Sequence, residues 1–92
     1  MPELFRFFGF VFFFYSREHE PLHVHVEGNG GNAKFDFEDT RGLFVLTESH
    51  GIKANDLRKI KRIVNDNADI IITAWNKYFG LDGQDNEDIF PR

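Results

Sequence analysis

The sequence predicts a small α+β domain, in which an antiparallel sheet of three to four strands is followed by a C-terminal helical segment packed on one face. Three observations lead to this class. Apolar and polar residues alternate over 22–27 and 32–38, a glycine-rich tetrapeptide at 28–31 separates these runs, and apolar residues from 57 onward recur at helical spacing. The 92 residues suffice for one domain with a modest core.

The first element is an aromatic run over residues 4–15. Aromatic and aliphatic residues on both alternating sets predict a central strand that is covered on both faces. Gly9 indicates a bulge or a bend, which would divide a short piece over 5–8 from a longer piece over 10–15. The chain contains 12 phenylalanines, so we expect a core built mainly on this residue.

The second strand is expected over 22–27, after a charged, proline-containing loop at 16–22. Its valines are expected to point inward, and His23, His25 and Glu27 outward.

The third strand, over 32–38, pairs antiparallel with the second through the 28–31 turn. A further turn at 39–42 leads to an apolar strand over 43–47.

The helical segment begins near Ala54, and Gly80 is its natural stop. The Asn-Asp-Asn run that ends at Asn67 favours caps over helix interiors, so the pattern leaves two alternatives: a break with a new helix from Ala68, or one kinked helix. We therefore expect a single domain over 1–80. An acidic, flexible tail is expected to follow it.

Composition narrows the classes of function. The chain has no cysteine, which excludes thiol chemistry and thiolate metal sites. Its apolar N-terminal run is too short to span a membrane and is interrupted by Arg6, so we expect a cytoplasmic protein without membrane association. A net charge of −4 argues against nucleic-acid binding by bulk attraction alone.

The main candidate site is the polar segment 19–27. Histidines two apart on a strand share a face and can share a metal. The candidate metal ligands are His19, His23, His25 and His50. Alternatively, His23 and His25 are candidate catalytic residues that act as acid and base on a phosphodiester. The competing interpretation is an ordinary polar strand surface.

A second cluster is basic and falls on the first half of the helical segment. Its members are Lys53, Arg58, Lys59, Lys61 and Arg62. Most lie away from the apolar stripe, which predicts a positive face that can contact phosphates. The alternative is a solvated helix surface, because no base-reading motif accompanies the cluster.

Three segments together resemble a known family. They are Arg6-Phe7-Phe8-Gly9, the run Pro21 to Glu27 with its His-x-His core, and the late pattern Asn67…Ile71…Trp75. This arrangement is similar to the bacterial domain-of-unknown-function family numbered 4160, over roughly residues 1–80. Here Leu22 stands where a second proline is expected, and Val24 stands where an aromatic residue is common.

The activity of that family is not established. Its members are small bacterial proteins that are often encoded beside another small protein, and some are considered toxin–antitoxin components. The resemblance therefore implies an interaction module that binds a small partner protein and needs no cofactor. Its expected binding surface comprises His19, His23, His25 and Glu27. The alternative is a small RNA- or phosphodiester-acting enzyme, with a divalent metal in one version. A homodimer stays open in either case.

Overall fold

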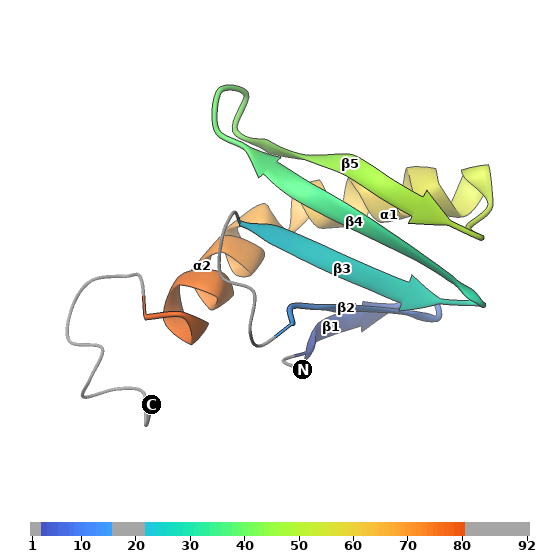
Figure 1. Cartoon of the computed structure of the whole chain (residues 1–92), viewed down its shortest axis with the longest axis horizontal. Coiled ribbons are helices and arrows are strands. Elements are labelled where there is room, and N and C mark those ends of the chain that lie inside the picture. Colours follow the sequence, from blue (N-terminus) through green and yellow to red (C-terminus); the bar gives the residue numbers. More distant parts are fainter. Residues whose placement is uncertain (1–2, 16–21, 81–92) are drawn as a thin grey trace.

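The computed structural model describes residues 3–15 and 22–80. Five strands form one antiparallel sheet in sequence order, and two helices cover one of its faces (Figure 1). The strands are β1 (Glu3–Phe7), β2 (Phe10–Phe13), β3 (His23–Gly28), β4 (Gly31–Glu38) and β5 (Leu43–His50). The helices are α1 (Ala54–Asp66) and α2 (Ala68–Tyr78). The predicted α+β class is confirmed, with one strand more than the upper estimate.

The additional strand comes from the N-terminal run, where one central strand was expected. Phe7 pairs with Phe10, so the chain reverses through a two-residue turn at Phe8 and Gly9. Both turn residues have positive φ, 34° and 90°. In the resulting hairpin β1 is an edge strand, and of these two strands only β2 lies between two neighbouring strands. Gly9 therefore marks a full reversal of the chain, because glycine readily adopts the left-handed region.

The 28–31 turn was predicted correctly. Gly28 pairs with Gly31, and the residues between them, Asn29 and Gly30, have φ of 50° and 80°. Positive φ at both central positions defines a type I′ turn, and its twist matches that of the flanking strands. The turn fixes the register of β3 on β4, which in turn selects the residues of β3 that face the helices.

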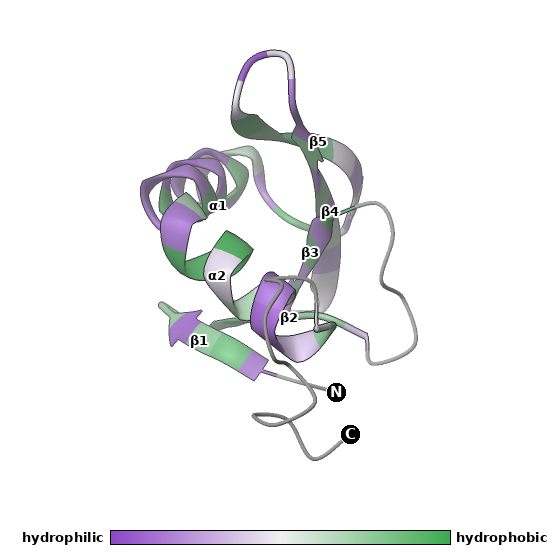
Figure 2. Ribbon diagram, turned by 90° about the vertical axis from the view of Figure 1, so that its left-hand side faces the viewer, coloured by the Kyte–Doolittle hydropathy of each residue, from purple (hydrophilic) through white to green (hydrophobic). Residues whose placement is uncertain are grey.

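The core lies between the sheet and the helices. Green, hydrophobic segments of both layers face this interior in Figure 2. Four phenylalanines of the sheet and the apolar stripe of the helices are almost wholly buried there: Phe10, Phe12, Phe35, Phe44, Ile60, Val64, Ile71 and Trp75. The expectation of a phenylalanine-based core is thus met. At one end, the rings of Phe14 and Trp75 meet edge to face with centroids 5.0 Å apart.

The helical segment breaks at Asn67, as the first of the two alternatives predicted. Asn67 has φ −108° and ψ 20°, and its side-chain amide donates to the Ile63 carbonyl at 2.8 Å. The backbone N–H of Asn67 also donates to this carbonyl, at 3.1 Å, and Ile71 N–H donates to the Asn67 carbonyl at 3.0 Å. The hydrogen bond from the Asn67 side chain to the backbone thus competes with regular helix geometry, and the interruption is limited to Asn67.

Three predictions fall on residues outside the described ranges. These are His19, most of the loop over 16–22, and the acidic tail over 81–92. Within 3–15 and 22–80, neither helix has the length and apolar character that crossing a bilayer requires.

Candidate functional site

The alternation of β3 is confirmed, but its first histidine is not exposed as predicted. Val24 and Val26 are fully buried on the helix side. His23 retains only 2% of its exposure. Its ring lies 5.3 Å from that of Trp75 and 4.9 Å from that of His25. His23 is buried because the side chain of Trp75, from α2, packs beside it at the start of β3. The residue spacing within one strand does not predict such a contact.

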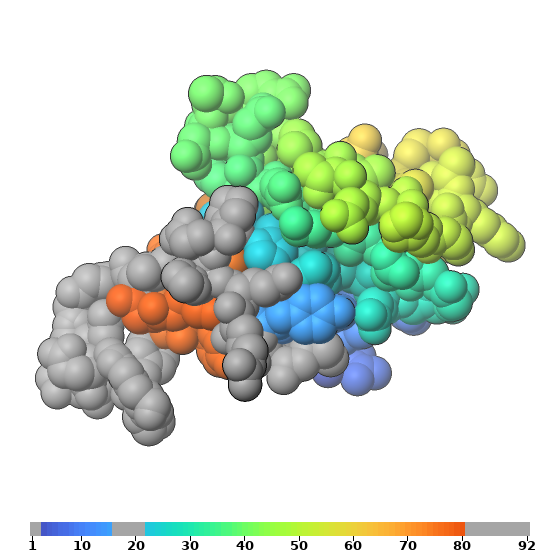
Figure 3. Space-filling view, in the orientation of Figure 1, coloured from blue at the N-terminus to red at the C-terminus, as the bar shows by residue number. Residues whose placement is uncertain are grey.

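His25 is half-buried against aromatic side chains. Its ring stacks on Phe13 at 5.5 Å and meets Tyr15 at 4.4 Å. These three side chains border a shallow depression of about 240 Å³, which also includes Lys34 and Glu48. Phe13 pairs with His25, and Lys34 is the register partner of both His25 and Glu48, so the depression crosses four strands, β2 to β5. The face of the sheet opposite the two helices is turned toward the viewer in Figure 3.

The other candidate residues, Glu27 and His50, lie on different strands of the sheet. Glu27 pairs with Asn32, and Asn32 pairs with His50, which places His50 two strands away from Glu27. Within the described ranges, no three His, Cys, Asp or Glu side chains gather closely enough to hold a metal ion. Because His19 lies outside those ranges, metal binding and acid–base catalysis stay predictions.

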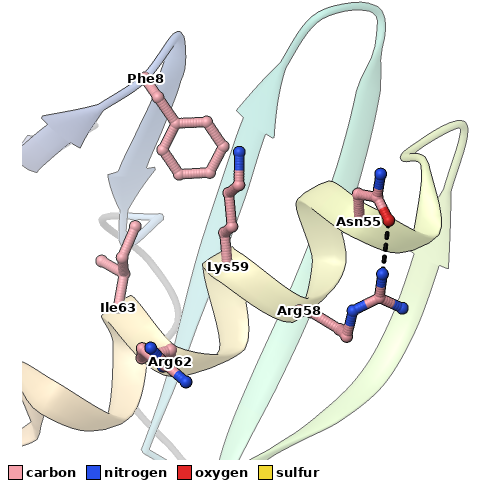
Figure 4. Close-up of a pocket in the computed structure, with 6 residues that line it drawn as sticks. All are labelled: Phe8, Asn55, Arg58, Lys59, Arg62 and Ile63. Carbon is pink, nitrogen blue, oxygen red and sulfur yellow. Dashed lines mark hydrogen bonds between the residues drawn. The ribbon is translucent and has the colours of Figure 1, made fainter.

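The basic cluster on α1 forms a better-defined site. Arg58, Lys59 and Arg62 line a pocket of about 510 Å³. Lys53 and Lys61 are exposed but do not line it. The structure thus brings three of the five predicted cations to one place. The complete lining, which we call the basic pocket, is Phe8, Asn55, Arg58, Lys59, Arg62 and Ile63 (Figure 4).

Helical spacing and one hydrogen bond arrange the cations. Asn55, Arg58 and Arg62 lie three and then four residues apart, so α1 presents them on one face. The Asn55 side-chain carbonyl accepts a hydrogen bond from the guanidinium of Arg58, drawn as a dashed line in Figure 4. This bond orients Arg58 without neutralising it, because the acceptor is an uncharged amide.

The cations of the basic pocket have no paired carboxylate among the described residues. Within 3–15 and 22–80, no carboxylate lines the pocket, and none forms a salt bridge with its three cations. Two other arginines of the chain differ in this respect. Arg6 pairs with Glu3 and Arg41 pairs with Glu38, and each hydrogen-bonded carboxylate raises the pKa of its arginine. The basic pocket therefore concentrates positive charge on a chain whose net charge is negative.

Phe8 closes the basic pocket from the side of the sheet. Its ring comes from the β1–β2 turn and points toward α1 in Figure 4. The ammonium of Lys59 lies 5.5 Å from the ring centroid, within the range of a cation–π contact. Phe8 was not among the predicted site residues, because it lies within an aromatic run that the sequence pattern assigns to a strand. The signal that could have found it is the Phe-Gly pair, two residues placed to turn a hairpin.

Comparison with known proteins gives one match. The family model described as "Domain of unknown function (DUF4160)" matches residues 9–76. Searches of curated proteins and of solved structures found no match. The matched range includes β3 with its two histidines, His23 and His25, and the whole of α1. It begins one residue after Phe8. Since the match spans most of the sequence, the chain belongs to the DUF4160 family.

Proposed function

We propose that this protein binds nucleic acid through the basic pocket. One observation carries the proposal: three cations that have no salt bridge to any described carboxylate share a pocket with an exposed aromatic ring. Arginine and lysine side chains contact phosphate oxygens in most nucleic-acid interfaces. At about 510 Å³, the pocket is in the size range of sites that enclose small organic groups, so it has room for a phosphate with its sugar.

The negative net charge of the chain does not oppose this function. Field strength at a surface depends on the local arrangement of charge, and acidic surroundings disfavour other docking orientations. Net charge governs bulk attraction at long range, whereas the basic pocket acts on a ligand locally. The negative remainder of the chain is expected to limit nonspecific binding elsewhere on its surface.

Fluorescence anisotropy with a labelled 12-nucleotide single-stranded RNA tests the proposal. Three phosphate contacts predict that affinity falls about 20-fold between 50 and 200 mM salt. Lys59→Ala and Arg62→Ala should each weaken binding and reduce the salt dependence. Lys61→Ala is the matched control, because Lys61 is exposed on the same helix but outside the basic pocket. Absent binding at 50 mM salt, or an equal effect of Lys61→Ala, would contradict the proposal.

A second candidate function is binding of a partner protein at the open edge of β1. β1 is the first strand of the sheet, and Phe7 at its end is 41% exposed. An extended segment of a small partner can add to such an edge through backbone hydrogen bonds. This interaction site differs from the histidine surface inferred from sequence, because His23 is buried.

The edge can be blocked by one substitution. Phe7 and Phe10 flank a two-residue turn and bond to each other, so the backbone N–H of Arg6 points to the open edge. Arg6→Pro removes this donor, while Arg6→Ala retains it and serves as the control. Native mass spectrometry with the neighbour-encoded protein should show a complex with Arg6→Ala and none with Arg6→Pro. A complex with both variants would exclude strand addition at β1.

A further inference from the structure

We propose that Phe8 is a stacking platform for an unpaired base, so that the ligand of the basic pocket is single-stranded nucleic acid rather than a duplex. This inference rests on the proposed function and deepens it. Its starting point is a comparison between the two tight hairpins of the chain. Both are two-residue turns with positive φ at each central position, 34° and 90° in one and 50° and 80° in the other.

The two turns differ in the residue at their first central position. The β3–β4 turn uses Asn29-Gly30, the pair that best tolerates this geometry. The β1–β2 turn has Phe8 at the position that Asn29 occupies in the other. A bulky residue with positive φ is strained, and such strain concentrates where a side chain must be held in place for function. The sequence thus favours a ring at this position over an unstrained turn.

The hydrophobic core does not account for that ring, because Phe8 belongs neither to the buried core nor to the residues packed against it. The side chain of Phe8 is 43% exposed, and its described ring contact is an edge-to-face approach to Phe10 at 5.2 Å. The turn itself is firmly placed. A Cβ added to Gly28 would lie 2.2 Å from the Gly9 carbonyl oxygen, so the backbones of the two turns are in close contact. The fold therefore fixes the backbone from which this exposed aromatic ring projects.

That position is beside the three cations. Phe8 and α1 face each other across the basic pocket in Figure 4, with Lys59 between the ring and the helix. A nucleotide whose phosphate is bound by Arg58 and Arg62 has its base within reach of the ring. Stacking on a base is stronger than a solvent-exposed cation–π contact, so the base can displace the flexible ammonium of Lys59 toward the phosphate.

The requirement for an unpaired base follows from this geometry. In a duplex both faces of each base are stacked on neighbours and are not open to a protein ring. Proteins that bind single strands combine a positive groove with aromatic side chains on which bases stack. The basic pocket presents both components on residues from two separate parts of the chain, the β1–β2 turn and α1.

The test compares four chain variants and four probes. The probes are a 12-nucleotide RNA strand, the same strand in a duplex, heparin as a polyanion without bases, and a polyglutamate peptide as an acidic polypeptide. Phe8→Asn removes the ring but suits the turn, and circular dichroism checks its fold. Phe7→Ala is the matched control, since Phe7 is equally exposed but outside the basic pocket. Phe8→Tyr restores a ring, and Lys59→Ala tests the charge.

We expect the wild-type protein to prefer the single strand to the duplex, and Phe8→Asn to weaken single-strand binding at least fivefold with an unchanged salt slope. Phe8→Tyr should bind normally, and a 2-aminopurine base in the strand should lose fluorescence on binding. Equal binding of strand and duplex, with no effect of Phe8→Asn, would overturn the stacking role and leave the proposed function intact. If none of the probes shows salt-dependent binding, both the stacking role and the proposed nucleic-acid binding are overturned. Tighter binding of a polyglutamate peptide than of RNA would also overturn both.

Discussion

The side-chain amide of Asn65 completes both backbone hydrogen bonds of Phe44. The Phe44 N–H donates to Asn65 Oδ1 at 2.9 Å, and Asn65 Nδ2 donates to the Phe44 carbonyl at 3.1 Å. β5 is the last strand of the sheet, so these backbone groups have no neighbouring strand on that side. A single side chain of α1 thus satisfies part of an open sheet edge and couples the helix layer to the sheet.

Asn65→Ala should therefore be more destabilising than an ordinary helix substitution. It leaves a donor and an acceptor of Phe44 without their partners in a partly buried place, which costs about 1–3 kcal/mol. Urea unfolding measures the loss. The control is Asp66→Ala, the next residue and an exposed one. Equal midpoints for the two variants would show that water replaces the Asn65 amide at no cost.

Gly28→Ala should destabilise the protein by a different mechanism. The added Cβ would lie 2.2 Å from the Gly9 carbonyl oxygen and 2.7 Å from the ring of Phe10, so backbone must move. Overpacking of this kind typically costs about 1–3 kcal/mol. Gly30→Ala is the comparison, because it has open space but a φ of 80° and so tests strain without a clash. A smaller loss for Gly28→Ala than for Gly30→Ala would contradict the close contact.

Local sequence signals predicted most elements of the fold. The 28–31 turn and the strands on either side of it follow from short-range chemistry, namely glycine, asparagine and hydrophobic period. For the helical segment, the Asn-Asp-Asn run left a break and a kink both open, and the structure has the break. The N-terminal hairpin was missed because both alternating sets of its residues are aromatic. The alternation of residue types therefore does not show where the chain reverses direction, and only the Phe8-Gly9 pair indicates the turn.

The candidate site was predictable only in part, because its members meet through tertiary structure. The cations of α1 were found from helical spacing, but the ring that faces them comes from the opposite end of the chain. His23 illustrates the converse case. Alternation with Val24 predicted an exposed His23, yet this histidine is buried beside Trp75, and no pattern within one strand predicts a contact with α2.

Trp75 is expected to be a major source of stability. It is almost fully buried and meets the rings of Phe14, His23 and Phe79 with centroids 4.5–5.3 Å apart. Trp75→Ala should lower the free energy of unfolding by about 3–5 kcal/mol, which approaches the whole stability of a small domain. Trp75→Phe keeps an aromatic ring and should cost clearly less. A folded, barely destabilised alanine variant in thermal melts would refute this role.

The pair of Glu38 and Arg41 should give a defined response to acid. The guanidinium of Arg41 donates a hydrogen bond to Glu38, which lowers the pKa of that carboxyl from 4.5. A lowered pKa means that the pair contributes stability above about pH 4.5. That contribution is lost as pH falls further, through the folded-state pKa. In an NMR titration, Arg41→Gln should raise the pKa of Glu38 and leave that of Glu3, which Arg6 lowers, unchanged. A rise at Glu3 would contradict independent pairs.

The two hairpin turns predict opposite effects when their residues are exchanged. Phe8→Asn places the preferred Asn-Gly pair in the β1–β2 turn, so it should raise the free energy of unfolding by about 1 kcal/mol through relief of positive-φ strain. Asn29→Phe puts a bulky residue at a φ of 50° in the β3–β4 turn and should lower stability by a similar amount. Chemical unfolding of both variants decides this. If Phe8→Asn destabilises the chain, the ring contributes more to folding than its exposed position implies; if it stabilises the chain and weakens RNA binding, position 8 trades stability for recognition.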